Sequence, residues 1–436
     1  MVLAAGVVGA GGAGFPTHVK LKCSPEVVIA NCAECEPMLK VDKNVMEHYP
    51  DRIAAGVAAV MEMTGAPRGC VALKAKNHKA AERMEEACAK YKNMEVYLLD
   101  NYYPAGDEQQ IVYEVTGKVV PVGGIPLDVG AVVCNACTMF NIANALDGKP
   151  VTKRFVTVNG DVKEPATFEA PVGTPASLLI SMAGGTLTGK LDGYALVLGG
   201  PMMGKYSEDF NFPITKTTSG ILVLPKNHKL IARKSSDLEK EAKIARSVCC
   251  QCNQCTQLCP RNELGLNVQP HKVMRAIAYG ALDAIEDGKI VFGCCDCGLC
   301  SQFACPMGLS PSRFVTAVKS GLAKKGIRPE KTASVGVSES RENTKVPTGR
   351  LVQRLGLASY TSEAPLFMGD VQVNKVRIAL AQHIGAPAEP CVKEGDTVSE
   401  GQLIAGIPEG KLGANIHASI SGKVVSIASG YIEIEG

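Results

Sequence analysis

The sequence predicts a multidomain protein that combines α/β and α+β sections, and three observations support this fold class. The chain has 436 residues, which at roughly 150 residues per domain indicates about three or more domains. Residues 1–150 alternate short apolar runs with helix-like stretches, whereas residues 151–232 and 370–436 consist of short runs between glycine and proline turns. Ten of the 18 cysteines lie between Cys249 and Cys305, so one further section is specialised for metal or redox chemistry.

The first section, residues 1–150, has the rhythm of an α/β domain. Apolar runs at 27–30, 71–73 and 95–99 predict buried strands, and the stretches near 51–63 and 79–91 predict helices between them. Strands that alternate with helices in this way are typical of βαβ units around a parallel sheet.

The remaining sections follow from changes in composition along the chain. Residues 151–232 predict a small β-rich domain with one short helix near 175–183, and residues 370–436 predict a second β-rich domain. Residues 238–325 hold the cysteine runs among helical segments. Residues 326–369 are polar, basic and rich in Ser, Thr and Gly, which is typical of a linker.

Charge and hydropathy exclude several classes of protein. The chain carries 46 basic and 43 acidic residues, which is too balanced for a nucleic-acid binder steered by its overall field. No run of 18 or more apolar residues exists, so we expect no membrane span. The N-terminal residues have no secretory-signal pattern, so we expect the reducing cytoplasm, where cysteines serve metals or redox chemistry.

Two cysteine runs carry the strongest chemical signal. The first, 249–260, has the spacing C-x2-C-x2-C-x3-C-P, and the second, 294–306, repeats it with four residues before its last cysteine. In bacterial ferredoxins, three thiolates of such a run bind one [4Fe–4S] cluster and the fourth reaches the other cluster. Zinc takes its ligands as two pairs, which fits these runs poorly. Exchanging the fourth cysteines predicts two ligand sets: set A, made of Cys249, Cys252, Cys255 and Cys305, and set B, made of Cys259, Cys294, Cys297 and Cys300.

The N-terminus contains a dense glycine loop, Gly9-Ala10-Gly11-Gly12-Ala13-Gly14. It fits G-x-G-x-x-G, but no clear strand precedes it, so the motif alone is weak. Such a loop lets a phosphate or a flat ring approach the backbone closely. A tight structural turn would be the preferred interpretation of the glycines taken alone.

The longer string GAGGAGFPTHVKL resembles the flavin-binding loop of the NADH-binding subunit of respiratory complex I. It is still more similar to two relatives of that subunit, the C subunit of the Rnf electron-transport complex and the cobalamin reductases of propanediol-utilisation microcompartments. Further strings agree over nearly the whole chain: NCAECEP at 31–37, YPAGDE at 103–108, NACT at 135–138, GPMMG at 200–204, both cysteine runs, QHIGAP at 382–387 and HASISG at 417–422.

The resemblance implies a Rossmann-like flavin domain, a β-grasp-like SLBB domain, a helical two-cluster ferredoxin domain and a C-terminal barrel-sandwich hybrid. It also implies FMN, two [4Fe–4S] clusters and NADH as the electron donor. It places Phe15, Glu36 and Glu108 near the nicotinamide nucleotide. The family pattern has Arg at Ala10 and Asp at Ala33, so two side-chain contacts to nucleotide are lost here. The implied cofactor-binding residues are Gly9, Gly11, Gly12, Gly14, Phe15, Lys20, Asn31, Glu34, Glu36, Tyr103, Gly106, Asp107, Glu108, Asn135 and Thr138.

The implied function is that of an oxidoreductase that passes electrons from NADH through FMN and two clusters to cobalamin. A flavin takes a hydride and can release its electrons singly, whereas clusters accept one at a time. The implied partners are cobalamin or a corrin-adenosylating enzyme, with microcompartment shell or cargo proteins, and the implied location is inside a bacterial microcompartment. Two alternatives stay open: the C subunit of an Rnf-type electron-transport complex, and a microcompartment protein that oxidises NADH with a non-corrin acceptor.

Two smaller patterns have both a functional and a structural interpretation. Cys32/Cys35 and Cys134/Cys137 form C-x2-C pairs near the implied flavin, where they could bind a metal or be redox-active, but small packed residues are the favoured interpretation. Lys411 lies near the swinging-arm position of a lipoyl-like fold but lacks the usual surroundings, so we expect a docking module rather than a modified lysine.

Overall fold

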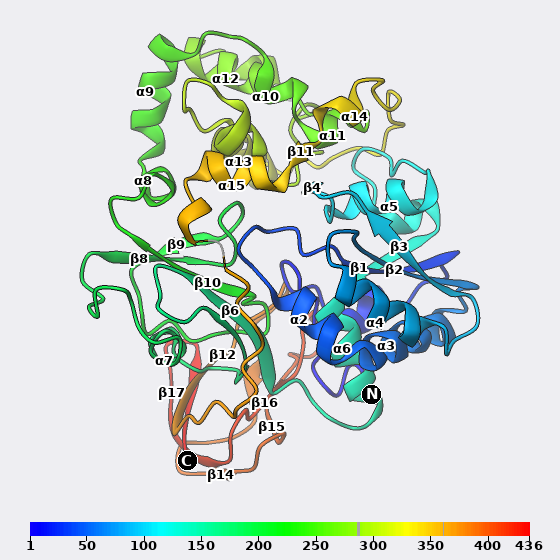
Figure 1. Ribbon diagram of the computed structural model, residues 1–436, viewed down its shortest axis with the longest axis vertical. Coiled ribbons are helices and arrows are strands. Elements are labelled where there is room, and N and C mark those ends of the chain that lie inside the picture. Colours follow the sequence, from blue (N-terminus) through cyan, green and yellow to red (C-terminus); the bar gives the residue numbers. More distant parts are fainter. Residues whose placement is uncertain (286–287, 361) are drawn as a thin grey trace.

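The computed structural model describes residues 1–285, 288–360 and 362–436 (Figure 1). The N-terminal α/β section lies on one side, and the sheet that follows it lies on the other. The cysteine-bearing helices lie across one end of the molecule, and the C-terminal strands lie at the opposite end. The expected multidomain fold class is confirmed. Among the described residues, no helix has both the length and the apolar character needed to cross a membrane.

The N-terminal section is built on a four-stranded parallel sheet with the order β3-β2-β1-β5. Because helices cover both faces, its strands are apolar on both sides: Val28 and Ala30 pack on one face and Val27 and Ile29 on the other. The strands are β1 (Val27–Cys32), β2 (Arg68–Lys74), β3 (Met94–Leu99) and β5 (Ala131–Asn135), and β4 (Tyr102–Tyr103) lies outside this sheet.

The helices of this section divide between the two faces of the sheet. Helices α3, α4 and α6 share one apolar core, whereas α5 packs on the other face. Gly56 of α3 lies so close to α6 that a Cβ there would overlap the Met139 carbonyl, so a glycine is required by the close approach. The helices are α1 (Thr17–Lys20), α2 (Val41–His48), α3 (Pro50–Thr64), α4 (His78–Cys88), α5 (Glu108–Thr116), η1 (Pro126–Val129) and α6 (Ala136–Leu146).

The second section is a five-stranded mixed sheet with the order β7-β6-β10-β8-β9 and one helix packed on it. Only β6 and β10 pair in parallel. The short helix expected near 175–183 is α7. The elements are β6 (Lys153–Gly160), β7 (Ala166–Pro171), α7 (Ala176–Met182), β8 (Tyr194–Leu198), β9 (Lys205–Ser207) and β10 (Gly220–Pro225).

The third section carries both cysteine runs on loops between short helices. Its apolar core is formed by residues of α9, α12 and α13, including Ala245, Val273 and Phe314. The elements are α8 (Lys229–Ser235), α9 (Leu238–Val248), α10 (Gln254–Gln257), α11 (Pro260–Glu263), α12 (Pro270–Tyr279), η2 (Leu282–Ile285), η3 (Cys300–Ala304) and α13 (Pro311–Lys324).

The segment 326–369, expected to be a linker, also carries packed structure. Arg341 is 5% exposed and forms an ion pair with Glu114 of α5 at 2.6 Å. Leu351 and Leu355 belong to a buried core cluster. The composition of the segment did not reveal these contacts because they are made with parts of the chain distant in sequence. The elements are α14 (Arg341–Thr344), β11 (Val346–Pro347), which pairs with β4, α15 (Thr348–Leu355) and η4 (Ala358–Tyr360).

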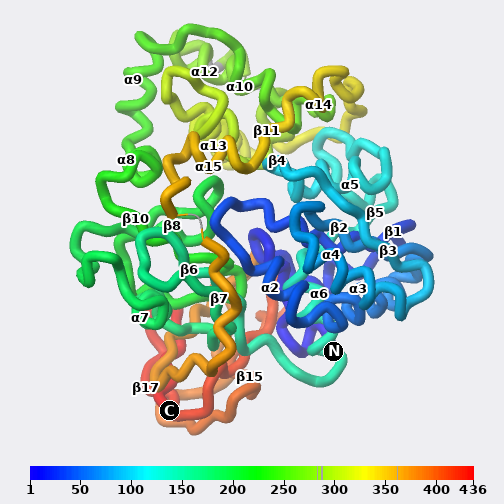
Figure 2. The backbone as a smooth tube through the Cα atoms, in the orientation of Figure 1, coloured from blue at the N-terminus to red at the C-terminus, as the bar shows by residue number. Residues whose placement is uncertain are grey.

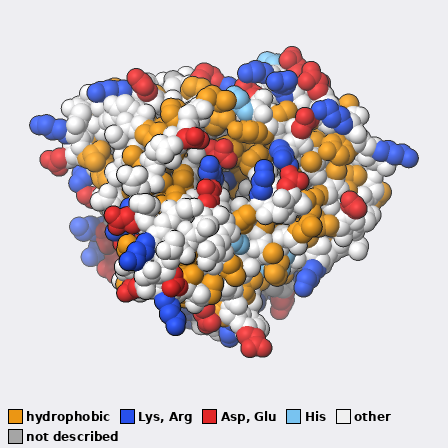
Figure 3. All heavy atoms as spheres, turned by 90° about the horizontal axis from the view of Figure 1, so that it is seen from below, with side chains coloured by type: hydrophobic (Ala, Val, Ile, Leu, Met, Phe, Trp, Pro, Cys, Tyr) orange, Lys and Arg blue, Asp and Glu red, His pale blue; other side chains and the backbone are white. Residues whose placement is uncertain are grey.

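The C-terminal section consists of two small sheets, with the orders β12-β18-β17-β14 and β13-β15-β16. Figure 2 shows the chain returning beside the N-terminal segments; Ile384 N–H donates to the Gly14 carbonyl at 3.3 Å. Seen from below, acidic and basic side chains are interspersed over the surface (Figure 3). The strands are β12 (Lys375–Ala379), β13 (Glu389–Pro390), β14 (Thr397–Val398), β15 (Leu403–Gly406), β16 (Ile416–His417), β17 (Gly422–Ala428) and β18 (Tyr431–Glu435).

Candidate functional site

A cavity of about 400 Å³ opens at the carboxyl ends of β1 and β5. From β1 the chain continues to β2 on one side of β1, whereas β5 pairs with β1 on its other side. The carboxyl ends of β1 and β5 therefore form a topological switch point, where open α/β sheets bind ligands. The register pairs Asn31 at the end of β1 with Asn135 at the end of β5. The fifteen residues expected to bind cofactor all line this cavity: Gly9, Gly11, Gly12, Gly14, Phe15, Lys20, Asn31, Glu34, Glu36, Tyr103, Gly106, Asp107, Glu108, Asn135 and Thr138.

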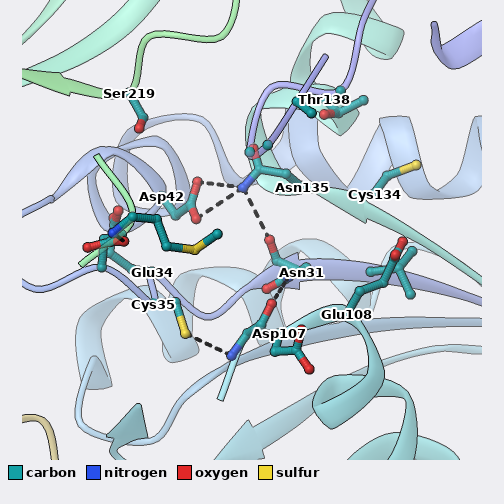
Figure 4. A pocket seen from close by; sticks show the side chains of 18 of the residues that line it. Asn31, Glu34, Cys35, Asp42, Asp107, Glu108, Cys134, Asn135, Thr138 and Ser219 are labelled. Carbon is teal, nitrogen blue, oxygen red and sulfur yellow. Dashed lines mark hydrogen bonds between the residues drawn. The ribbon is translucent and has the colours of Figure 1, made fainter. Parts of the chain in front are cut away.

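Asn135 organises the floor of the cavity (Figure 4). Its side-chain Nδ2 donates to both carboxylate oxygens of Asp42 at 3.1 Å and to the Asn31 carbonyl at 3.5 Å. Its Oδ1 accepts from Cys137 N–H at 3.0 Å and caps the N-terminus of α6. The amide orientation is therefore set by three neighbours. Asp42 has no motif around it, and sequence reasoning did not identify it.

The glycine loop lies directly against the beginning of α6. Ala10 N–H donates to Thr138 Oγ1 at 2.9 Å, and a Cβ at Gly11 would lie 2.8 Å from the Cβ of Asn135. A side chain at position 11 would therefore push the loop away from the helix. The loop stays exposed at residues 11–13, so its backbone is open to a ligand.

Two carboxyl groups of the cavity wall, the half-buried Glu34 and the buried Asp42, have raised pKa values. Burial, with the nearby charge of Asp42 as the second cause, raises the pKa of Glu34 to about 8. Burial also raises the pKa of Asp42 to about 6. The Glu34 carboxylate accepts a hydrogen bond from Lys43 N–H at 3.0 Å. The raised pKa favours the protonated form of Glu34, which can donate a hydrogen bond to a bound group.

The three residues that the resemblance places near the nicotinamide differ in their exposure and contacts. Phe15 is 38% exposed. Glu108 forms an ion pair with Lys20 at 2.8 Å; burial lowers the pKa of Lys20, but this pair outweighs burial and the pKa is raised. Both carboxylate oxygens of Glu36 accept backbone N–H groups, from Met202 at 2.9 Å and Met203 at 2.7 Å. Glu36 thus holds the 202–203 turn against the cavity.

Two buried donors of the cavity wall have no hydrogen-bond partner among the described residues, namely Thr17 Oγ1 and Arg154 Nη1. The other Arg154 nitrogens donate to the Thr218 carbonyl at 3.0 Å and to the Ala10 carbonyl at 2.8 Å. An unpaired buried donor is costly, so these atoms fit a ligand with acceptor oxygens, such as the phosphate or ring carbonyls of FMN. Arg154 comes from the second section, and no motif marks it.

The cysteines of set A come together as the exchange of fourth ligands requires, and so do those of set B. Set A lines a cavity of about 230 Å³, and set B lines a much smaller one of about 10 Å³. Burial, with the neighbouring sulfurs of set A, raises the pKa of Cys255 to about 12. Among the described residues no three His, Cys, Asp or Glu side chains could share a single metal ion. A [4Fe–4S] cluster does not require its ligands to share one ion, because each of its four thiolates binds a different iron.

The cavity at the carboxyl ends of β1 and β5, which we call the flavin cavity after the resemblance of its glycine loop, shares a wall with set B. Cys297 and its non-ligand neighbour Cys295 line both spaces, and Tyr103 Oη donates to the Cys297 carbonyl at 2.6 Å. Arg261, two residues after Cys259, forms a bidentate ion pair with Asp107, with both N–O distances 2.6 Å. These contacts fix the cysteine loops against the cavity.

The four cysteines of the two C-x2-C pairs lie in two environments. Cys35 and Cys134 line the cavity, and Cys35 Sγ accepts from Gly106 N–H at 3.0 Å. Cys32 and Cys137 lie in the apolar core of the first section. Each C-x2-C pair thus contributes one residue to the cavity wall, and Cys134 belongs to the apolar core as well.

Comparisons with known proteins agree with this arrangement. The chain matches the Nuo51 FMN-binding domain over residues 2–144, the SLBB domain over 155–206, the 4Fe-4S dicluster domain over 248–310 and the RnfC barrel sandwich hybrid domain over 359–435. It therefore combines an FMN-binding domain with a two-cluster domain.

Relatives match the chain along its length. It is 40% identical to cobalamin reductase PduS of Citrobacter freundii and 41% identical to that of Salmonella typhimurium, in both cases over 99% of this chain and 95% of the relative. It is 37% identical to the C subunit of the Na⁺-translocating ferredoxin:NAD⁺ oxidoreductase complex of Acetobacterium woodii, over 62% of this chain and 58% of that relative. The chain belongs to the family of the PduS cobalamin reductases.

Proposed function

We propose that the protein is an NADH-dependent cobalamin reductase, which moves electrons from NADH through FMN and two [4Fe–4S] clusters to a corrin. The wall shared by the flavin cavity and set B carries the proposal, because it gives electrons a direct route from one cofactor to the next. The reductase activity named for the PduS relatives supports the choice of acceptor.

The residues of the cavity would then act as follows. FMN supplies the conversion between a two-electron hydride donor and one-electron acceptors. The backbone of the glycine loop and the unpaired donors of Thr17 and Arg154 would hold its polar groups. Glu34 would donate its proton as a hydrogen bond to the ring, and Phe15 with Glu108 would border the nicotinamide. The other expected residues, among them Tyr103, Gly106 and Asp107, would shape the wall toward set B.

Anaerobic reconstitution tests this function directly. The purified protein should contain about eight iron and eight sulfide per chain and should reduce hydroxocobalamin with NADH faster than free FMN at the same concentration. A Cys252→Ala variant should lose one cluster and keep flavin absorbance. A holoprotein that oxidises NADH with an artificial acceptor but shows no corrin reduction above free FMN would contradict the corrin acceptor.

That last outcome would favour the second candidate, a protein that oxidises NADH with a non-corrin acceptor. An Rnf-type component is less well supported, because that relative aligns over 62% of this chain whereas the PduS relatives align over 99%. We also propose a cytoplasmic location inside a bacterial microcompartment, with a corrin-adenosylating enzyme and shell or cargo proteins as partners. Co-purification of the protein with intact compartments, and its absence from the unbound fraction, would test this location.

A further inference from the structure

We propose that the two cysteine sets act in a fixed order: the cluster of set B takes electrons from the flavin, and the cluster of set A passes them on. The acceptor is carried by a partner protein whose docking surface is acidic. This inference rests on the proposed function and assigns separate roles to the two clusters. NADH gives the flavin a hydride, and the flavin releases the two electrons one at a time with its protons. Each cluster carries one electron, so two one-electron transfers leave set A per NADH.

The entry side is defined by what borders the flavin cavity. Cys295 and Cys297 line it, whereas no cysteine of set A is among the described residues that do. The hydrogen bond from Tyr103 to the Cys297 carbonyl and the Arg261–Asp107 ion pair hold this wall in place. Set B therefore borders the flavin cavity and set A does not, and the short segments 255–259 and 300–305 each connect a cysteine of one set to a cysteine of the other.

The exit side is defined by exposure. Cys252 of set A and its neighbour Gln251 are exposed, whereas no cysteine of set B is exposed. The sets are otherwise alike, because each also has two buried cysteines and one that is half-buried or, in set B, two. Met307 borders the set A cavity and is 46% exposed. A cluster held by set A would thus lie near the surface, within reach of a docked partner.

The chemistry of the partner follows from the charges around this opening. Arg275 lines the set A cavity, and Lys272 lies one turn earlier on α12; both side chains are exposed. The described residues that line the cavity include no Asp or Glu. Tyr279, 72% exposed, is hydrogen-bonded to Gln251 at 3.1 Å. An apolar contact bordered by cations suits an acidic protein surface that carries the acceptor.

Matched ligand variants test the order by electron paramagnetic resonance (EPR). Cys300→Ala removes a set B ligand and Cys255→Ala a set A ligand, and neither residue lines the flavin cavity. In Cys300→Ala, NADH should bleach the flavin but give no cluster signal, while dithionite should reduce the remaining cluster. In Cys255→Ala, NADH should reduce the remaining cluster. Equal reduction by NADH in both variants would overturn the order, whereas no flavin bleaching in wild type would overturn the proposed function itself.

A second test uses the wild-type protein, so it does not require a ligand variant to fold with its remaining cluster. In fully reduced holoprotein, a soluble dysprosium chelate should accelerate spin relaxation of one cluster signal several-fold and leave the other nearly unchanged. Equal acceleration of both signals would contradict a single exposed cluster.

Charge reversal tests the docking face. In the dithionite-reduced Cys300→Ala background, an added Arg275→Glu change should slow oxidation of the set A cluster by ferricyanide several-fold and speed its oxidation by hexaammineruthenium(III), at low ionic strength. Lys393→Glu, at an exposed site in the C-terminal section, is the matched control and should alter neither rate. Equal rates with and without Arg275→Glu would refute the electrostatic docking.

Discussion

The ion pair between Asp107 and Arg261 should hold the flavin domain to the cysteine loops, and Asp107→Asn tests this. The two side chains are only 7% and 11% exposed and form two N–O contacts of 2.6 Å. Asn keeps an oxygen that can cap the N-terminus of α5. Its amide nitrogen replaces one of the two oxygens that accept from Arg261, so the change removes the charge and one acceptor. Leaving the Arg261 cation buried and unpaired should cost about 3–5 kcal/mol.

Native-state hydrogen exchange measures this cost at the contact itself. At about 1.4 kcal/mol per tenfold, amides of 108–117 and 260–266 should exchange roughly 150- to 4,000-fold faster in Asp107→Asn, up to the limit set by global unfolding. Glu95→Gln is the control, because the Arg68–Glu95 pair is 42% and 52% exposed and should contribute about 1 kcal/mol or less.

The double variant Asp107→Asn/Arg261→Met completes the cycle. Removing both charges leaves no unpaired ion, so exchange should return most of the way to the wild-type rate. If Asp107→Asn alone leaves both segments within threefold of wild type, or if the double variant is no better than the single one, the pair does not hold this interface.

Three further changes test the cavity. Gly11→Ala places a Cβ 2.8 Å from that of Asn135 and should lower the free energy of unfolding of the apoprotein by about 1–3 kcal/mol, whereas Gly12→Ala meets nothing within 4 Å and should leave it unchanged; equal urea midpoints would contradict this. Glu34 has a raised pKa, about 8 against an ordinary 4.5, so its contribution to stability is complete below pH 4.5 and is lost as the pH rises through 8. The urea midpoint of Glu34→Gln should therefore fall less over this range than that of wild type. Parallel pH profiles of the two proteins would refute the assignment. Tyr103→Phe removes the hydroxyl that donates to the Cys297 carbonyl at 2.6 Å and should lower the free energy of unfolding by about 1–2 kcal/mol. An unchanged urea midpoint would show that the hydrogen bond contributes no net stability.

Much of the site could be predicted from local sequence. The spacing of the two cysteine runs predicted the ligand sets, because metal clusters impose spacing on a short loop. The glycine loop and the string around Asn135 predicted residues that the structure brings to one cavity. Arg154 and Asp42 were missed, since each enters the cavity from an element with no motif of its own. The segment 326–369 was expected to be a linker, and the contact of Arg341 with α5 has no local signature.

The sequence by itself determined the cofactor chemistry and predicted the section order and the two cluster ligand sets, because these depend on residue types at short spacing. The tertiary structure alone decided which cysteine set lines the flavin cavity, which cysteine of set A is exposed, and which buried donors have no partner among the described residues. These properties depend on contacts between residues such as Asp107 and Arg261, which are far apart along the chain and meet only when the domains pack. Packing also sets burial, and burial rather than residue type raises the pKa of Glu34.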